Sequence, residues 1–213
     1  MKSTTGERQP ISGDVSVSVI VATYDAADTL QRCVASILGQ DHPGVELLIA
    51  DGGSTDGTLD IIKRHADRLA WWVSEPDSGL YSAWNKAIPH AKGEWICFLG
   101  ADDALATSDV VRQMLPFLAD AVGRYRVVYG QLDVIEEDGS ISRSLGTPWS
   151  EAGPRFTSEM SIPHPGCFHH RSLFEEHGLF DESYRIAADY EFLLRELPGH
   201  EALFVADVTT VHM

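Results

Sequence analysis

The chain has 213 residues, of which 44% are hydrophobic and 23% are charged, a balance typical of a folded globular protein and not of a disordered chain. Acidic residues outnumber basic residues 32 to 16, giving a formal net charge of -16. This charge disfavours binding to nucleic acid or to anionic lipid, because phosphate contacts require clustered Lys and Arg side chains.

The cysteines and the apolar runs indicate the cellular compartment of the protein and whether it spans a membrane. Cys33, Cys97 and Cys167 are widely spaced and odd in number, and two of them lie in apolar runs, which indicates reduced, buried thiols and a cytoplasmic location. No apolar run has the length that crossing a bilayer requires, and the N-terminus lacks the apolar segment of a signal peptide. We therefore predict no transmembrane segment, with peripheral association at the inner face of a membrane left open.

The first half of the chain alternates strands with helices. Residues 1–14 are predicted to form a polar arm, and residues 15–213 a single α/β domain. Apolar and amphipathic patterns predict strands at 15–22, 45–50, 69–73 and 94–99, and helices at 28–38, 58–65, 78–88 and 108–118, with Asp28 as the first N-cap. Such alternation needs crossover connections and hence a doubly wound, mainly parallel sheet.

The second half of the chain follows a different pattern. Residues 127–135 and 141–145 flank a turn sequence, which predicts an antiparallel hairpin. Further on, the sequence predicts a loop at 148–170, helices at 172–177 and 187–197, and a closing strand at 203–211. The expected fold is therefore α/β, with a doubly wound, mainly parallel sheet and a C-terminal antiparallel hairpin extension.

Polar residues collect where the first strands end. Thr23 and Tyr24 follow the first strand, residues 51–54 the second, residues 75–79 the third, and Asp102 and Asp103 the fourth. Because ligands of open parallel sheets bind beyond the carboxyl ends of the strands, we expect one polar crevice at this edge.

The glycines at 52, 53 and 57 were compared with the known phosphate-binding loops. Their spacing does not fit Gly-x-Gly-x-x-Gly, and Gly-Lys-Ser/Thr is absent, which argues against a dinucleotide fold and a P-loop. The simpler interpretation is a tight strand-to-helix turn with Asp56 as a cap.

The adjacent carboxylates of Asp102 and Asp103 are the sharpest local feature. Two such groups repel each other unless a cation or hydrogen-bond donors hold them. Mg²⁺ and Mn²⁺ prefer oxygen ligands and commonly bind one or two carboxylates together with substrate phosphates. The alternative is a surface turn with Asp103 as a helix N-cap, but the three neighbouring polar strand ends favour the metal site.

Two other groups of residues were considered for chemistry. The run from His164 to His170 lacks the ligand spacing of a zinc site, so we expect a loop histidine, His164, that donates to a phosphate or to an acceptor. Asp189 begins a helical stretch, where it either complements the helix dipole or serves as a general base. The two roles are compatible, since the dipole keeps the carboxylate ionised.

Four blocks of sequence, taken in order, resemble the family 2 glycosyltransferases, the inverting group with the GT-A fold. The blocks are residues 17–62, which contain VSVIVATYDAADTL and IADGGSTDGT, then EPDSGLYSAWNKAI, GEWICFLGADD and SIPHPGCFHHRSLFEEHGLFDESYRIAADYEFLLR. The last block resembles the bacterial polysaccharide-synthesis branch. The resemblance divides the domain into a nucleotide-sugar half at about 15–106 and an acceptor half at about 107–213.

The resemblance implies a role for each matching residue. Asp189 would be the catalytic base, Asp102 and Asp103 the Mg²⁺ or Mn²⁺ corner, and His164 a residue on the acceptor or phosphate side. The donor, most simply a UDP-sugar, would contact Thr23, Tyr24, Asp51, Gly53, Ser54, Asp77, Gly79, Tyr81, Asn85, Lys86 and Asp102. In this scheme Asp51 accepts a hydrogen bond from the nucleobase, and the acceptor is a glycan or a lipid-linked glycan.

The expected reaction is a single displacement with inversion, because one carboxylate suffices to deprotonate the attacking hydroxyl whereas retaining hydrolysis needs two flanking carboxyls. Two rival functions remain: a nucleotidyltransferase, and a non-catalytic module that binds nucleotide sugars. The second rival is supported by two departures from the family pattern, Gly100 in place of the first acid of Asp-x-Asp and Ala188 in place of the acid before Asp189.

Overall fold

The structure, a computed structural model, describes residues 4–7, 17–136 and 138–212. Its strands are β1 (Thr4–Glu7), β2 (Val17–Thr23), β3 (Val45–Asp51), β4 (Trp71–Ser74), β5 (Trp95–Gly100), β6 (Ala104–Leu105), β7 (Val127–Ile135), β8 (Ile141–Leu145), β9 (Phe168–His170) and β10 (Leu203–His212). Its helices are α1 (Leu30–Leu38), α2 (Thr58–His65), α3 (Leu80–Ala87), the 3-10 turn η1 (Ile88–His90), α4 (Val110–Ala121), α5 (Trp149–Phe156), α6 (Ser172–His177) and α7 (Ala188–Leu194).

A single mixed sheet organises these elements. The strand order is β1-β4-β3-β2-β5-β9-β7-β10-β6, and β8 pairs with β7. β2 lies between β3 and β5, and it runs parallel to both, as β4 does to β3. The register places Thr23 beside Asp51 and Asp51 beside Ser74, so the carboxyl ends of β2, β3 and β4 meet at one edge. The predicted α/β fold with a mainly parallel sheet in its first half is confirmed.

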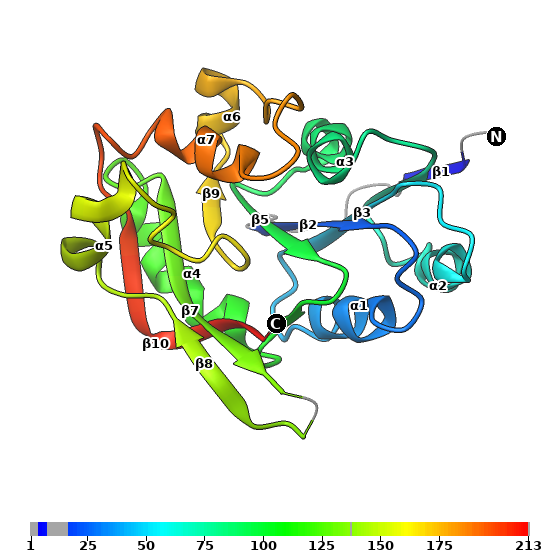
Figure 1. Ribbon diagram of the computed structural model, residues 1–213. Coiled ribbons are helices and arrows are strands. Elements are labelled where there is room, and N and C mark those ends of the chain that lie inside the picture. Colours follow the sequence, from blue (N-terminus) through cyan, green and yellow to red (C-terminus); the bar gives the residue numbers. More distant parts are fainter. Residues whose placement is uncertain (1–3, 8–16, 137, 213) are drawn as a thin grey trace.

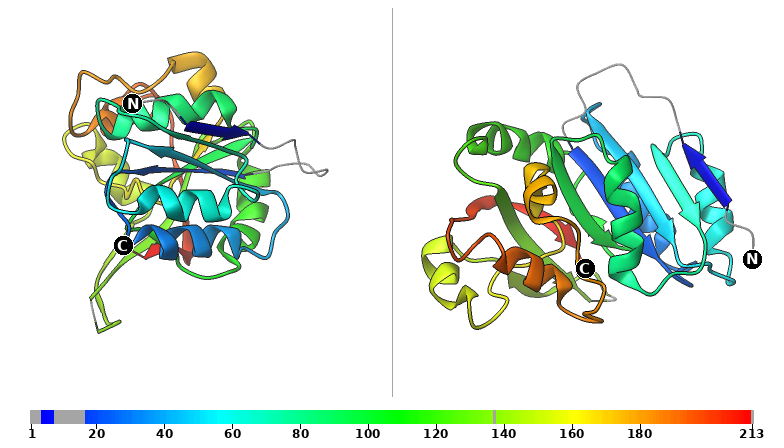
Figure 2. Two further views of the ribbon diagram at one scale, coloured as in Figure 1. Left: turned by 90° about the vertical axis from the view of Figure 1, so that its right-hand side faces the viewer. Right: turned by 90° about the horizontal axis from the view of Figure 1, so that it is seen from above.

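Two hydrophobic layers enclose the sheet because successive residues of a strand face opposite sides. Val19 and Val21 of β2 face the core under α1, α2 and α4, whereas Ile20 faces the core under α3, α5, α6 and α7. Figure 1 shows α3, α6 and α7 on one side of the sheet and α1 and α2 on the other, and the side view in Figure 2 shows the same layering. Most buried residues on both faces of the strands are apolar, as the sequence predicts, so each face of the sheet forms a core with the helices that cover it.

The two halves of the sheet are joined by a strand that the sequence did not predict. β9 pairs antiparallel with β5 on one side and with β7 on the other, within a stretch predicted to be a loop from 148 to 170. The same stretch contains α5. Both elements escape pattern analysis, because β9 has three residues and α5 carries Gly153 and Pro154, which disfavour helix in isolation.

Three smaller predictions were wrong or incomplete. Thr4–Glu7, inside the predicted polar arm, form β1 and pair antiparallel with β4, whereas residues 8–16 lie outside the described part of the chain. The first helix has Thr29 and not Asp28 at its N-cap position. The two-residue strand β6, paired with β10, was not predicted. By contrast, the bounds of α2, α6 and the β7–β8 hairpin agree with the prediction.

The chain offers no membrane-spanning helix within its described ranges, since none of the helices there is both long and apolar enough for a bilayer.

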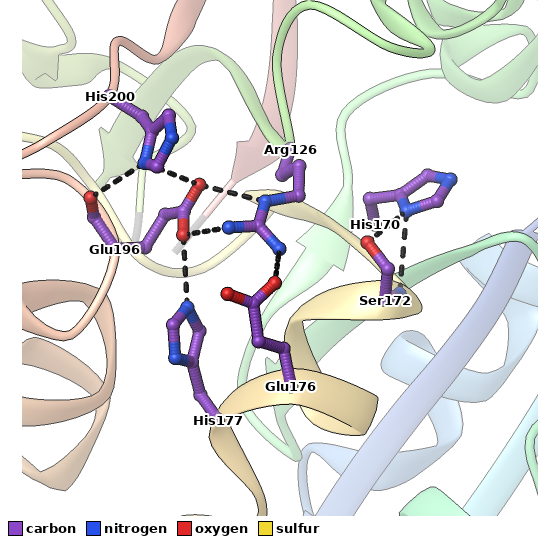
Figure 3. Close-up of polar contacts among 7 residues, drawn as sticks. All are labelled: Arg126, His170, Ser172, Glu176, His177, Glu196 and His200. Carbon is purple, nitrogen blue, oxygen red and sulfur yellow. Dashed lines mark hydrogen bonds and ion pairs between the residues drawn. The ribbon is translucent and has the colours of Figure 1, made fainter.

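A buried carboxylate ties α6 and the end of α7 to the start of β7 (Figure 3). Glu196 is 3% exposed and accepts two hydrogen bonds from the guanidinium of Arg126, one of them at 2.8 Å. His177 Nε2 lies 2.9 Å from Glu196 Oε2, His200 Nδ1 lies 3.2 Å from Oε1, and Arg126 also pairs with Glu176. Such a network fixes α6 and α7 to the C-terminal half of the sheet.

We expect Glu196→Gln to lower the free energy of unfolding by about 3 kcal/mol, because it leaves the largely buried Arg126 without its principal counter-charge. Urea titration followed by circular dichroism measures this difference. Asp120→Asn is the control, since Asp120 forms an exposed pair with Arg124 and its loss should change stability by less than about 0.5 kcal/mol. If both substitutions changed the free energy of unfolding equally, the network around Glu196 would not stabilise the fold.

Candidate functional site

A cavity of about 560 Å³ opens at the carboxyl ends of β2 and β3 and beside the start of α3. Its walls are Ala22, Thr23, Tyr24, Gly52, Pro76, Asp77, Ser78, Gly79, Leu80 and Ala83. The volume lies in the range of small-molecule sites, and the position is the one at which open α/β sheets bind ligands. The predicted crevice is therefore present, with Thr23, Tyr24, Asp77 and Gly79 among its walls.

Tyr24 and Asp77 converge over Gly52. Tyr24 is 67% exposed, which is unusual for a large aromatic residue and leaves its ring free to stack on a ligand. A side chain at Gly52 would meet the Tyr24 ring at 3.1 Å and the Asp77 carboxylate at 3.3 Å, so only a glycine leaves this floor open. The Asp77 carboxylate accepts a hydrogen bond of 2.9 Å from the backbone N–H of Gly79, whose φ of +126° suits a residue without a side chain.

Asp51 does not face this cavity. The side chain is 1% exposed and accepts hydrogen bonds from Ser74 Oγ at 2.6 Å, from the N–H of Ser54 at 3.1 Å and from Ser54 Oγ. The sequence predicts that the Asp51 carboxylate accepts a hydrogen bond from a nucleobase. In the structure, both of its oxygens already accept hydrogen bonds from protein donors. Ser54 is likewise occupied, since its Oγ also accepts from the N–H of Asp25 at 2.8 Å.

Three further residues that were predicted to contact the nucleotide sugar do not line the cavity. Gly53 has a φ of +86° and packs closely against the backbone of Pro76, which makes it part of the turn. Asn85 is buried and donates to Phe180 O at 2.9 Å and to Glu182 Oε1 at 3.0 Å. Lys86 forms an ion pair of 3.0 Å with Glu75. These side chains hold the loops around the crevice in this structure.

Asp102 and Asp103 differ in exposure, although an oxygen of each carboxylate lies within 3.2 Å of the position that a Cβ at Gly100 would take. Asp102 is exposed, and its carbonyl accepts from Arg32. Asp103 is 3% exposed and accepts a hydrogen bond of 2.8 Å from the N–H of Gly100, and burial raises its pKa to about 6. The described residues contain no cluster of three or more Asp, Glu, His or Cys side chains suited to a metal ion. Of the predicted pair, Asp102 therefore offers the available carboxylate, whereas Asp103 stabilises the turn after β5.

Asp189 lies in the first turn of α7 and is hydrogen-bonded to α3, whose residues Leu80 and Ala83 line the cavity. Tyr81 of α3 donates a hydrogen bond of 2.9 Å to Asp189 Oδ1, and His164 Nδ1 lies 3.8 Å from Oδ2. Burial and the neighbouring carboxylate raise the pKa of Tyr81 to about 12, so its hydroxyl keeps the proton that it donates. Ala187, two residues earlier, has a φ of +68°, an uncommon conformation that aims the start of the helix at this site. The structure thus brings together Tyr81, His164 and Asp189, although Tyr81 and Asp189 are 108 positions apart in the sequence.

Six cavity residues are not named individually in the sequence prediction, although the predicted segments 51–54, 75–79 and 79–86 contain five of them. Ala22, Gly52, Pro76, Ser78, Leu80 and Ala83 line the walls. Most of them contribute backbone or apolar surface, for which no chemical pattern in the sequence exists. Their position after a strand end was the available signal, because the segments 51–54 and 75–79 had been placed at the crevice as whole loops.

Comparison with known proteins decides the family. A profile described as "Glycosyl transferase family 2" matches residues 18–178. The chain belongs to glycosyltransferase family 2. A "PGL/p-HBAD biosynthesis glycosyltransferase" of Mycobacterium tuberculosis is 34% identical over 183 residues, covering 84% of this chain and 68% of the relative. The chondroitin synthase of Pasteurella multocida is 33% identical over 84% of this chain and 18% of its own length.

Solved structures share the fold of this family 2 chain. S. aureus TarS 1-349 in complex with UDP has a TM-score of 0.76 at 18% identity, over 93% of this chain and 60% of that one. The mannosyltransferase PcManGT from Pyrobaculum calidifontis, in complex with GDP-Man and Mn2+, has a TM-score of 0.71 at 23% identity, over 95% of this chain and 57% of that one. The chain thus has the GT-A type of α/β fold and spans about three fifths of these solved structures.

The occupied carboxylate of Asp51 leads to a prediction about stability. Asp51→Asn replaces one of two acceptor oxygens by a donor, so at least one serine hydroxyl loses its partner, and we expect the free energy of unfolding to fall by about 2–3 kcal/mol. Differential scanning calorimetry checks this, with the exposed Asp28→Asn as a matched control. The contrary result, unchanged stability together with a loss of UDP affinity, would return Asp51 to the role of reading a nucleobase.

Proposed function

We propose that the protein is an inverting glycosyltransferase that moves a sugar from a nucleoside-diphosphate sugar, a UDP-sugar in the first instance, to a hydroxyl acceptor. The observation that carries the proposal is the position of Asp189, a carboxylate held by Tyr81 beside the cavity at the strand ends. A donor in that cavity and a base at its side are the two parts that a single displacement requires.

The donor's nucleoside fits the part of the cavity formed by Tyr24, Asp77 and Gly52. The exposed ring of Tyr24 provides a face for stacking a base, and the Asp77 carboxylate provides an acceptor for a base or ribose donor. The diphosphate would then extend towards Gly79 and Asp102. Complexes of TarS with UDP and UDP-GlcNAc, and of PcManGT with GDP-Man, support a nucleotide sugar as the ligand.

Asp189 would act as the general base. The acceptor hydroxyl transfers its proton to this carboxylate while its oxygen attacks the anomeric carbon from the face opposite the leaving nucleoside diphosphate. Glu191, two residues later, is engaged in an ion pair with Arg195 and lies on a different face of α7. One free carboxylate on the acceptor side supports inversion of configuration, because retention through a covalent intermediate would need a second one as nucleophile.

A divalent cation, Mg²⁺ or Mn²⁺, fits this site through one protein ligand. Asp102 is exposed at the carboxyl end of β5 and would hold the ion together with the donor's phosphates, as such ions commonly bind. The ion would supply charge neutralisation for the departing diphosphate. Asp103 would support Asp102 through the turn that it closes with Gly100. The complex of PcManGT with Mn2+ supports this use of a metal.

The acceptor would be a glycan or a lipid-linked glycan in the synthesis of a cell-surface polysaccharide or glycolipid. The relatives named for PGL/p-HBAD biosynthesis and for chondroitin synthesis support this class of acceptor. We propose a cytoplasmic location, with peripheral association at a membrane when the acceptor is lipid-linked. Three free, buried cysteines support a reducing compartment.

Removal of the base is the central test. We expect Asp189→Asn to lower the turnover number by about 10²–10⁴-fold with donor affinity unchanged, because the side chain meets the acceptor and not the nucleotide. Glu191→Gln is the matched control and should cost far less. A screen of nucleotide sugars by thermal shift supplies the donor, and the anomeric configuration of the product is read by NMR. Near-parental transfer by Asp189→Asn, or a retained configuration, would contradict the proposal.

The metal is tested separately from the chemistry. We expect Mn²⁺ to tighten UDP binding to the parent protein and Asp102→Asn to abolish most of that gain, while binding in EDTA stays the same in both. Isothermal titration calorimetry measures the four affinities, and Asp120→Asn, on the exposed side of α4, is the control. Equal UDP affinity of the parent with and without Mn²⁺ would remove the metal from the mechanism.

A further inference from the structure

Three buried ring nitrogens beneath Asp189 have no hydrogen-bond partner among the described residues: Trp84 Nε1, His164 Nε2 and His169 Nε2. Their side chains are 5%, 5% and 0% exposed, respectively. The His164 ring lies 5.4 Å from that of Trp84 and 5.0 Å from that of His169, centroid to centroid, and all three rings contact Phe98. An unpaired buried polar group costs about 1–3 kcal/mol, so each of these nitrogens calls for a hydrogen-bond partner.

The chemistry of the neighbours assigns donor and acceptor roles to these nitrogens. The indole N–H of Trp84 can only donate. His169 Nδ1 lies 3.3 Å from the carbonyl of Ile96, which can only accept, so Nδ1 carries the hydrogen. Burial, with His164 nearby, lowers the pKa of His169 to about 3, so the ring is neutral and its Nε2 is an acceptor.

His164 follows the same logic through Asp189. Burial lowers the pKa of His164, so this ring is neutral as well. Its Nδ1 faces Asp189 Oδ2 at 3.8 Å, and an ionised carboxylate only accepts, which favours hydrogen on Nδ1 and leaves Nε2 as an acceptor.

We propose that His164 is a positioning residue for Asp189: the neutral ring carries its hydrogen on Nδ1, and this N–H donates to the carboxylate in the complex with acceptor. This role rests on the proposed function of Asp189 as the base. The distance of 3.8 Å is beyond hydrogen-bond reach, but catalytic contacts are often long in free enzymes and shorten when substrate binds.

The consequence is a carboxylate held on both oxygens. Tyr81 of α3 holds Oδ1, and His164, from the loop before β9, holds Oδ2. On α7 itself, the other acid, Glu191, is paired with Arg195, and His169 of β9 lies behind His164. Two donors from different elements fix the plane of the carboxylate, so a free lone pair can be aimed at the acceptor hydroxyl. Losing one of them should disturb orientation and ionisation, and leave donor binding alone.

Two amide substitutions form a matched pair for the test. Asn at 164 can place an N–H near the position of Nδ1, whereas Gln places its amide near Nε2, where it cannot reach Asp189. We expect His164→Gln to lower the turnover number by about 100-fold, as a misplaced catalytic group does, and His164→Asn to recover most of it. The Michaelis constant for the donor should be unchanged in both variants. The acid limb of the pH profile should move up by about one unit in His164→Gln, because the charged form of Asp189 loses a donor.

A second measurement does not depend on turnover. The ¹⁵N shifts of the His164 ring in the parent protein should show hydrogen on Nδ1 and none on Nε2, and a ¹³C titration should place the Asp189 pKa higher in His164→Gln than in His164→Asn. Hydrogen on Nε2 of His164, or identical kinetics and pH profiles for the two amide variants, would overturn the proposal. If no donor is turned over by the parent protein, the glycosyltransferase proposal fails, while the NMR result still decides the contact between His164 and Asp189.

Discussion

The buried carboxylate of Asp51 is the interaction on which the crevice depends. It accepts hydrogen bonds from Ser74 at the end of β4 and from Ser54 after β3, and Ser54 in turn accepts from the backbone of Asp25 after β2. The Asp25 carboxylate completes the ring by accepting from the N–H of Thr55 at 2.8 Å. Three strand ends are thus joined by hydrogen bonds that the carboxylates of Asp51 and Asp25 and the hydroxyl of Ser54 accept. Tyr24 directly precedes Asp25, so these hydrogen bonds hold the backbone from which its exposed ring projects.

The surroundings of Asp189 depend on a different element, the short strand β9. By pairing with both β5 and β7, it continues the sheet from the N-terminal half of the chain into the C-terminal half. The loop before it carries His164, and the helices after it are fixed to β7 by Glu196 and Arg126 (Figure 3). Asp189 on α7 consequently reaches Tyr81 on α3, at the opposite side of the crevice mouth. A base built on packed helices is positioned more exactly than one on a free loop.

The sequence predicts an element correctly where its local hydrophobic pattern matches the burial that the tertiary structure imposes on it. Buried strands such as β3 are mostly apolar, and α2 has both an amphipathic pattern and basic residues in its last turn, so their bounds could be predicted closely. The sequence also predicts the loops after β2, β3 and β4 as walls of a crevice, and residues of these loops line the cavity. The direction of a carboxylate could not be predicted: Asp51 and Asp103 follow strands as a ligand-binding residue would, and only the fold shows that Ser54, Ser74 and Gly100 already hold them.

The buried cysteines have a practical consequence. Cys33, Cys97 and Cys167 are buried free thiols, and burial raises the pKa of each of them, to about 12 for Cys97. Thiolates are the species that react with alkylating reagents and oxidants, so the folded chain is shielded from both. A cysteine introduced on the exposed loop that precedes α7, for example in place of Ser183, would then be the only reactive thiol in the native protein. A fluorescent label could be attached there without replacing any native cysteine, and it would report whether a ligand binds next to Asp189.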